Sequence, residues 1–179
     1  TNSIFSKNSA GVDGGGFYSY RHPHILTNST FTNNSVGGNG GGFSSSSSIV
    51  TNSTFTNNSA DHTGGGLYTI SSYNESTVTN STFTNNSAVI SGGGIQIKTT
   101  YSSSPVVTNS IFTNNSTGGN GGGINTNASY GTVTLTITNS TFTNNSAVIS
   151  GGGLFSHYSI LTNSIFSKNS AGVDGGGFY

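Results

Sequence analysis

The stretch Thr138-Asn139-Ser140-Thr141-Phe142-Thr143-Asn144-Asn145-Ser146-Ala147, followed by Gly151-Gly152-Gly153-Leu154, decides the fold because close copies of it recur along the whole chain. The copies begin at seven threonines: Thr1, Thr27, Thr51, Thr79, Thr108, Thr138 and Thr162. Their spacing of 24 to 30 residues is typical of a solenoid, in which units stack because no unit can bury its apolar face alone. We therefore expect a single repeat solenoid over residues 1–179.

The first and last copies are identical, since Thr1 to Tyr18 matches Thr162 to Tyr179 at every position and closes a super-period of 161 residues. Neither copy has the atypical sequence of a capping repeat. Uncapped coils expose strand edges that pair with further strands. We expect the coils to continue axially, either in one covalent chain or by head-to-tail stacking of subunits, which is a contact that grows without closing.

Within a copy, apolar residues alternate as in a β-strand. Val133, Leu135 and Ile137 share one face. Phe142 returns to that face if the alternation slips by one residue at Asn139, because Asn tolerates the left-handed backbone of a corner. No helical periodicity is present, so the sequence predicts an all-β coil of parallel strands with three sides and a rise of about 4.8 Å.

Two columns of identical residues are expected to form structural ladders inside the solenoid. Aromatic stacking explains the phenylalanine column at Phe5, Phe31, Phe55, Phe83, Phe112, Phe142 and Phe166 without a ligand. The second column never varies and is predicted to be an inward amide ladder at a corner, with plain turn chemistry as the alternative: Asn8, Asn34, Asn58, Asn86, Asn115, Asn145 and Asn169. The asparagines of the Thr-Asn-Ser corner, such as Asn28, Asn52, Asn80 and Asn139, are expected to be internal as well and to form a similar ladder.

The position before the invariant asparagine is predicted to face solvent, because Lys7 and Lys168 occupy it in two copies and a dry core does not tolerate an unpaired ammonium. In the other five copies it carries an asparagine in an Asn-x-Ser context. These residues are possible glycan acceptors: Asn33, Asn57, Asn85, Asn114 and Asn144.

The glycine triplet of each copy is expected to let the backbone bend where a Cβ would clash. Segment length varies only between this triplet and the next Thr-Asn-Ser, as in residues 19–26, 45–50, 96–107 and 125–137. Insertions should therefore bulge from one face, which is where solenoids often bind partners.

The paired signals Phe31-Thr32-Asn33-Asn34 and Gly40-Gly41-Gly42-Phe43, present in all seven copies, resemble the Phe-x-x-Asn and Gly-Gly-(Gly/Ala)-(Ile/Leu/Phe) repeats of the chlamydial polymorphic outer-membrane proteins and related surface proteins. The resemblance covers the whole chain and implies a right-handed, single-stranded parallel β-helix. It also implies secretion, a location at the cell surface and often an adhesive role. Fold alone does not fix function, since β-helices serve adhesins, filaments, polysaccharide enzymes and ice-binding proteins.

Composition argues against several classes of function. Four Lys and Arg balance four Asp and Glu, so there is no basic footprint for nucleic acid or for an acidic membrane. No apolar run is long enough for a transmembrane helix, and any targeting signal is expected outside these residues. The acids are Asp13, Asp61, Glu75 and Asp174. Asp13 and Asp174 are copies of one position in coils six apart, about 29 Å from each other, so they cannot be the carboxylate pair of a glycosidase.

No cofactor or metal is expected. Asp61 beside His62 is interpreted as a solvated loop pair, and His22-Pro23-His24 beside Arg21 lacks a third metal ligand. The runs Gly37–Gly42 and Gly118–Gly123 lack the acidic ligands of a calcium site and the Lys-Ser/Thr of a phosphate-binding loop. We expect a protein that is not an enzyme.

Two functional hypotheses remain. The favoured one is an extracellular structural or adhesive solenoid that builds a cell-surface filament with itself as partner, and that contacts surface glycans or a neighbouring or host cell. The alternative is a carbohydrate-binding or ice-binding module. Sugar stacking would use Tyr20, Tyr73, Tyr101, Tyr130 and Tyr158, whereas ice binding would use the threonine file at the fourth position of the repeat, which Ile4, Ile111 and Ile165 interrupt.

Overall fold

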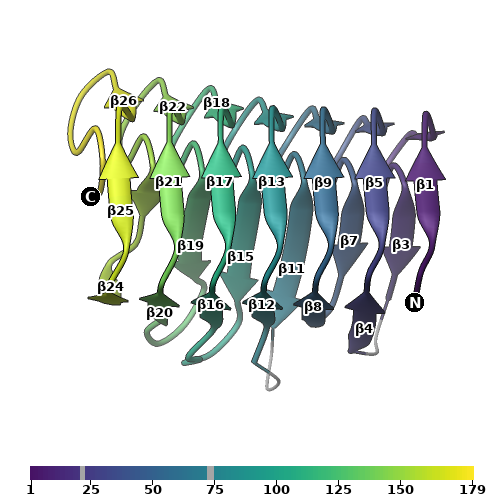
Figure 1. Ribbon diagram of the computed structural model, residues 1–179, viewed down its shortest axis with the longest axis horizontal. Helices are drawn as coiled ribbons and strands as arrows, with labels where there is room; N and C mark the ends of the chain where they lie inside the picture. The colour runs from purple at the N-terminus through teal and green to yellow at the C-terminus, as the bar shows by residue number, and fades with distance from the viewer. Residues whose placement is uncertain (21–22, 72–74) are drawn as a thin grey trace.

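The computed structural model describes residues 1–20, 23–71 and 75–179, and in them every regular element is a β-strand. The strands stack in parallel along one axis as a β-solenoid (Figure 1). The predicted all-β fold of stacked parallel coils is confirmed. Each strand pairs with its counterpart in the coils before and after it, in the register that the repeats predict; Phe83, for example, pairs with Phe55 and Phe112.

Two of the sheets, each seven-stranded, come from the Thr-Asn-Ser half of the repeat. The first, which faces the viewer in Figure 1, contains β1 (Ile4–Ser6), β5 (Thr30–Thr32), β9 (Thr54–Thr56), β13 (Thr82–Thr84), β17 (Ile111–Thr113), β21 (Thr141–Thr143) and β25 (Ile165–Ser167). The second contains β2 (Ser9–Ala10), β6 (Ser35–Val36), β10 (Ser59–Ala60), β14 (Ser87–Ala88), β18 (Ser116–Thr117), β22 (Ser146–Ala147) and β26 (Ser170–Ala171).

The other two sheets are six-stranded and flank the variable segment. The third follows the glycine triplet and contains β3 (Phe17–Ser19), β7 (Phe43–Ser45), β11 (Leu67–Ser71), β15 (Ile95–Thr99), β19 (Ile124–Ala128) and β23 (Leu154–Phe155). The fourth leads into the next Thr-Asn-Ser and contains β4 (His24–Thr27), β8 (Ser48–Thr51), β12 (Thr77–Thr79), β16 (Val106–Thr108), β20 (Thr134–Thr138) and β24 (Tyr158–Thr162).

Left-handed residues make the two corners around the first sheet. Asn28 and Asn33 have φ angles of 51° and 56°, and their equivalents in the other coils, Lys7 and Lys168 included, have similar values. The phase slip predicted at Asn139 is confirmed, since its φ is 51° and Ser140 lies inside. The prediction of three sides is wrong: the residues after the second corner form a short strand of their own, so each complete coil has four sides.

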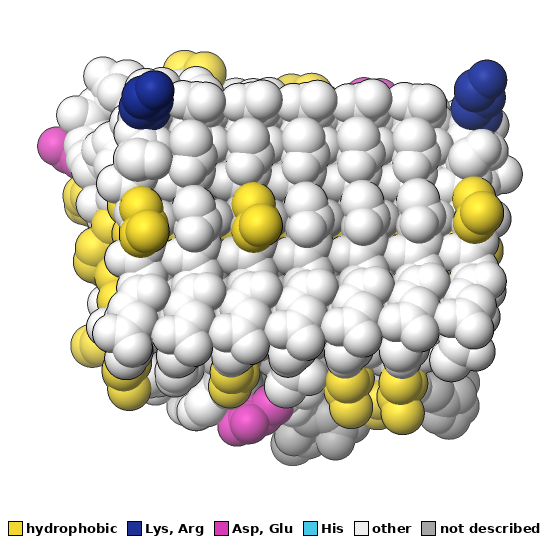
Figure 2. Space-filling model, in the orientation of Figure 1, with side chains coloured by type: hydrophobic (Ala, Val, Ile, Leu, Met, Phe, Trp, Pro, Cys, Tyr) yellow, Lys and Arg dark blue, Asp and Glu magenta, His cyan; other side chains and the backbone are white. Residues whose placement is uncertain are grey.

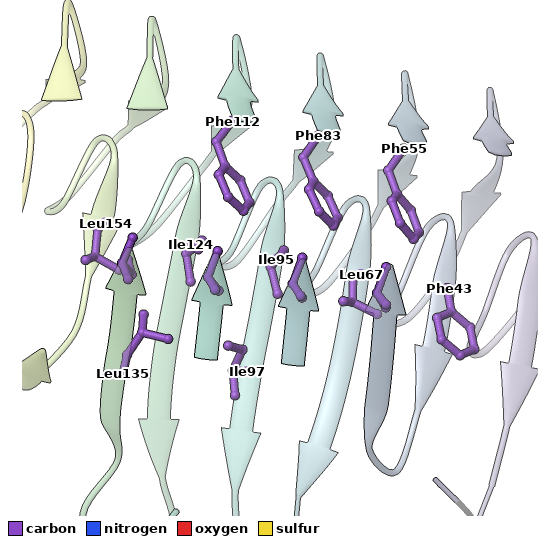
Figure 3. Close-up of a cluster of buried hydrophobic side chains, with 14 of the residues drawn as sticks. Phe43, Phe55, Leu67, Phe83, Ile95, Ile97, Phe112, Ile124, Leu135 and Leu154 are labelled. Atoms are coloured by element: carbon purple, nitrogen blue, oxygen red, sulfur yellow. The ribbon is translucent and has the colours of Figure 1, made fainter. Parts of the chain in front are cut away.

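Every sheet sends side chains into the core. Phenylalanines come from the first sheet, small residues such as Ala60 and Ala88 from the second, residues such as Leu67 and Ile95 from the third, and residues such as Val107 from the fourth. Figure 3 shows the phenylalanines facing the aliphatic file across the coil. The core is thus a stack of thin, repeated layers. Each fully buried side chain of this size contributes about 1.5–3 kcal/mol to the free energy of unfolding.

The glycine triplet lies where the chain turns from the second sheet into the third. Its first residue has a positive φ, 69° at Gly64, and a Cβ on the third residue, Gly66, would lie 2.7 Å from the carbonyl oxygen of Gly94. Glycine is therefore required twice over, for conformation and for close approach of neighbouring coils.

The variable segments all connect the third sheet to the fourth, so they gather at one edge of the solenoid, at the bottom of Figure 1. The connection between β19 and β20 is longer than the one between β23 and β24. Loop length can change at this edge without disturbing the stacked strands.

The close approach at the glycine triplet predicts a selective effect of Gly93→Ala. A Cβ there would lie 2.5 Å from the carbonyl oxygen of Gly122 and 2.7 Å from the carbonyl carbon of Ser116, both backbone atoms of the next coil. We expect a loss of about 3 kcal/mol in the free energy of unfolding, measured by denaturant titration. Gly11→Ala is the matched control, because a Cβ at Gly11 meets nothing within 4 Å, and it should be neutral or stabilise by up to about 1 kcal/mol. Equal effects of the two variants would contradict the steric argument.

Candidate functional site

The phenylalanine column forms one continuous stack along the axis. Consecutive ring centroids from Phe5 to Phe166 lie 4.6 to 5.0 Å apart with interplanar angles of 3° to 9°. These spacings match the distance between hydrogen-bonded strands, about 4.8 Å. The five inner rings are fully buried, so each is covered by the ring before it and the ring after it.

The invariant asparagines form an amide ladder beside this stack. Asn86 is buried: its Nδ2 donates to the backbone oxygen of Phe55 (3.0 Å) and to Oδ1 of Asn115 (3.0 Å). Its Oδ1 accepts from both the backbone N–H and Nδ2 of Asn58. The same contacts run from Asn8 through Asn34, Asn58, Asn86, Asn115 and Asn145 to Asn169. Every inner amide thus has its two donors and its acceptor oxygen occupied.

The Thr-Asn-Ser corner contains a ladder of a different residue from the one predicted. Asn28, Asn52, Asn80 and Asn139 are exposed rather than internal, because the left-handed conformation turns the asparagine outward and the following serine inward. The serine hydroxyl accepts the N–H of the serine one coil before it and donates to the carbonyl of the threonine two residues earlier; Ser53 does so at 3.1 and 2.9 Å. The signal was present in the sequence, since this serine is as invariant as the asparagine before it.

The five possible glycan acceptors, Asn33, Asn57, Asn85, Asn114 and Asn144, lie exposed at the second corner. Their φ angles of 55° to 56° point the side chains away from the core. The first corner also exposes its asparagines. The structure therefore leaves both rows of Asn-x-Ser/Thr sequences on the surface.

Between the two corners, the first sheet presents an even outer face of small side chains (Figure 2). Two files of threonine run along it, at the fourth position of the repeat (Thr30, Thr54, Thr82 and Thr141) and at the sixth (Thr32, Thr56, Thr84, Thr113 and Thr143). We call this surface the threonine face. Ile4, Ile111 and Ile165 interrupt the first file. Lys7 and Lys168 lie at the second corner, which borders this face, in the first and last coils.

The acidic residues are dispersed. Asp13 accepts hydrogen bonds from the backbone N–H and Nδ2 of Asn39 at 3.0 and 2.9 Å, so it belongs to a further polar ladder. Asp174 occupies the equivalent place six coils away, and Asp61 and Glu75 are exposed. Among the described residues, no three His, Cys, Asp or Glu side chains are grouped so as to hold a metal ion.

The sequence singled out a histidine pair, His22 and His24, and a set of tyrosines for stacking on sugars. The ring of His24 packs edge-on against Phe17 at 5.3 Å, whereas Arg21, His22 and Tyr73 lie outside the described residues. Tyr20, Tyr101, Tyr130 and Tyr158 are all exposed, on or beside the loop edge.

Tyr68, on the third sheet, is a buried tyrosine. Burial raises the pKa of Tyr68 to about 12, and the negative charge of Asp13 adds to the effect. Its phenol therefore stays neutral at physiological pH. The described residues offer three kinds of surface: the axial ends of the ladders, the threonine face and the edge where the loops between the third and fourth sheets gather.

Comparison with protein families gives a match between residues 1–174 and the family described as right handed beta helix region. Comparisons with curated proteins and with solved structures give no match. In the described part of the chain, no helix has the length and apolarity to cross a membrane. The narrower resemblance to the chlamydial proteins stays a prediction.

The amide ladder predicts that Asn86→Asp destabilises the chain strongly and in a pH-dependent way. The substitution removes two donors and places a carboxyl group in the core, which raises its pKa above the unfolded value of about 3.9. Because the folded state then holds the proton more tightly, the unfolding free energy should fall as the pH rises above about 4, by about 3 kcal/mol or more at neutral pH.

The control for this experiment is Asn85→Asp, one residue away. Asn85 is exposed and its left-handed conformation is one that Asp tolerates, so the change should stay within about 0.5 kcal/mol at each pH. Denaturant titrations of both variants between pH 4 and 8 measure the difference. If the two pH profiles coincide, the ladder does not stabilise the core in the way described.

Proposed function

The chain belongs to the right-handed β-helix family, and from this premise we propose that it is a non-enzymatic, extracellular structural and adhesive solenoid that builds a filament at the cell surface. The β-helix fold is consistent with a structural or a binding role. The observation that carries the proposal is the axial complementarity of the ladders, which run through every coil with the same donor-to-acceptor direction.

The two end faces of the ladders complement each other. At the first coil, Oδ1 of Asn8 accepts no hydrogen bond from another described residue, whereas at the last coil the backbone N–H of Asn169 donates none. Within the stack these two groups pair at 2.9 to 3.1 Å. Since Thr1–Tyr18 and Thr162–Tyr179 have the same sequence, a further coil would meet the last one in the register that the inner coils already use.

Apolar residues of the two outermost coils have a stacked neighbour on one side only. Phe178 is 43% exposed, although the equivalent residues of the inner coils, such as Leu154 and Ile124, are fully buried. Phe5 is only partly buried, although the five inner rings of its column have no exposed surface. A stacked coil, whether from the same chain or from a second copy, would cover this surface and extend both the aromatic and the amide ladders.

In the proposed filament the sides of the solenoid make the adhesive contacts, and the chain catalyses no reaction. The dispersed acids support the absence of glycosidase chemistry, which needs two carboxyl groups on either side of one bond. The side surfaces repeat along the axis, so a filament would present each of them many times. Multiple weak contacts of one kind give high total avidity.

Axial assembly is tested by electron microscopy and sedimentation of the chain, with Phe178→Lys as the disrupting variant. Fibres with an axial repeat of about 4.8 Å are expected. The variant should lower the association constant at least about tenfold, because stacking would bury an unpaired ammonium. Ile25→Lys is the matched control, since Ile25 is an exposed apolar residue on the side of the solenoid. Compact monodisperse particles of the unaltered chain, or equal effects of both variants, would contradict the proposal.

A second candidate function, the binding of ice, is favoured by the threonine face. Its side chains repeat at about 4.8 Å between coils and about 6.6 Å between alternate residues of a strand. The face is uncharged in the five coils between Lys7 and Lys168. Hydroxyl and methyl groups held in such a lattice can order a layer of water, which a mobile charged surface cannot do.

Thermal hysteresis separates this second function from axial assembly. We expect the unaltered chain to lower the freezing point below the melting point and Thr84→Lys to abolish the effect, because an ammonium at the centre of the face imposes its own hydration. Thr77→Lys is the control: Thr77 is a half-buried strand threonine like Thr84, but it belongs to the fourth sheet. If the unaltered chain shows no hysteresis, or if Thr84→Lys keeps it, the ice-binding function is wrong.

A further inference from the structure

The loop edge has a step between the fifth and sixth coils. The connection from β19 to β20 spans residues 129–133, whereas the connection from β23 to β24 spans only residues 156–157. The shorter loop leaves the end of the longer one uncovered, and a depression of about 320 Å³ lies there. Its lining includes Asn127, Ala128, Thr132, Val133, His157 and Tyr158.

One wall of the depression carries an oriented amide. Oδ1 of Asn127 accepts a hydrogen bond from Nε2 of Gln96 at 3.0 Å. Gln96 is itself buried and held through its Oε1, which accepts from Ser91 Oγ and from Nδ2 of Asn125, each at 2.7 Å. The hydrogen bond from Gln96 fixes the orientation of the Asn127 amide, and its NH₂ group is left to donate to a ligand.

The sixth coil contributes two rings, His157 and Tyr158, to the lining. Ser156 Oγ accepts from Thr126 Oγ1 and donates to the backbone oxygen of Tyr158, both at 2.9 Å. The ring of His157 packs edge-on against Phe155 with centroids 5.8 Å apart. Tyr158 is 58% exposed, so a face of its ring is available for stacking.

Behind the floor of the depression lie two buried hydroxyls without partners. Ala128 and Val133 pair in register with Thr99 and Ser103 of the preceding coil. Thr99 Oγ1 and Ser103 Oγ make no hydrogen bond with any described residue. Both hydroxyls are buried and neither residue lines the depression, so they are not contacts for a ligand in it.

Charge and size narrow the class of ligand. The lining contains no Asp, Glu, Lys or Arg, and the charged group nearest in register is Lys98, which pairs with Asn127. A cationic ligand is therefore disfavoured, and no cluster of cations attracts an anionic one. The volume is at the small end of ligand sites, about 300–1,000 Å³, and it suits one or two sugar rings.

We propose that this depression is a binding site for a neutral saccharide, with the NH₂ of Asn127 donating to a sugar hydroxyl and the ring of Tyr158 stacking on the apolar face of the sugar. An aromatic ring with a fixed amide serves such a ligand because a sugar has an apolar C–H face and a rim of hydroxyls. The lining comes from two coils of one chain and the supporting Gln96 from a third coil of the same chain, so the site does not depend on axial assembly.

The test is NMR spectroscopy of the full chain with methyl glycosides of glucose, galactose, mannose and N-acetylglucosamine as probes. Saturable shifts of the amide signals of residues 126–133 and 157–158 are expected for at least one glycoside, with a Kd of about 1 mM. Asn127→Ala and Tyr158→Ala should each weaken binding at least tenfold. Ala128→Leu should do the same by filling the depression while leaving its polar groups intact.

Tyr130→Ala is the matched control, because Tyr130 is 72% exposed on the same loop and does not line the depression. It should leave the Kd within twofold of the unaltered chain, and unchanged thermal unfolding should show that each variant is folded. The proposal is overturned if none of the four glycosides binds saturably, if the lining variants bind as the unaltered chain does, or if Tyr130→Ala loses binding equally. If the chain does not assemble but still binds the sugar, only the filament proposal is overturned.

Discussion

The structure depends on one constraint, the stacking of each residue on its own counterpart about 4.8 Å along the axis. The amide ladder pairs its donors and acceptors because the residues above and below are also amides, and each inner ring of the phenylalanine column is covered by the rings before and after it. Asn86 and Phe83 are fully buried on these terms. Repetition of the sequence is therefore the means by which the core is filled and its polar groups are paired.

The same constraint separates the parts of the coil that can vary from those that cannot. A glycine of the triplet is in contact with the backbone of the next coil, and a serine of the Thr-Asn-Ser corner is bonded to the coil before it. The connections between the third and fourth sheets lie outside these corners, and their lengths differ from coil to coil. The step that forms the proposed sugar site arises because two neighbouring connections differ in length.

Two errors of prediction have a common origin. Asn28 and its equivalents were expected inside, and the coil was expected to have three sides. Both expectations counted alternation along the strand but not the direction in which a left-handed residue turns the chain. At φ near 50° the asparagine side chain points outward, and the side chain of the serine after it points into the core. After the second such corner, the two residues Ser35 and Val36 already pair with the neighbouring coils, so the second sheet forms there and the coil has four sides in place of three.

The sequence by itself determined the repeat, the parallel strands, the inward phenylalanines, the invariant inward asparagine and the need for glycine, because each of these follows from periodicity and from the chemistry of single residues. Only the tertiary structure decided which member of the Thr-Asn-Ser corner is buried, how the two threonine files share one face, and where the loops leave a depression. These features depend on the direction of each turn and on the difference between neighbouring coils. Asn127 and Tyr158 are 31 residues apart in the sequence, and nothing in either repeat indicates that Gln96, from a third coil, holds the amide in place.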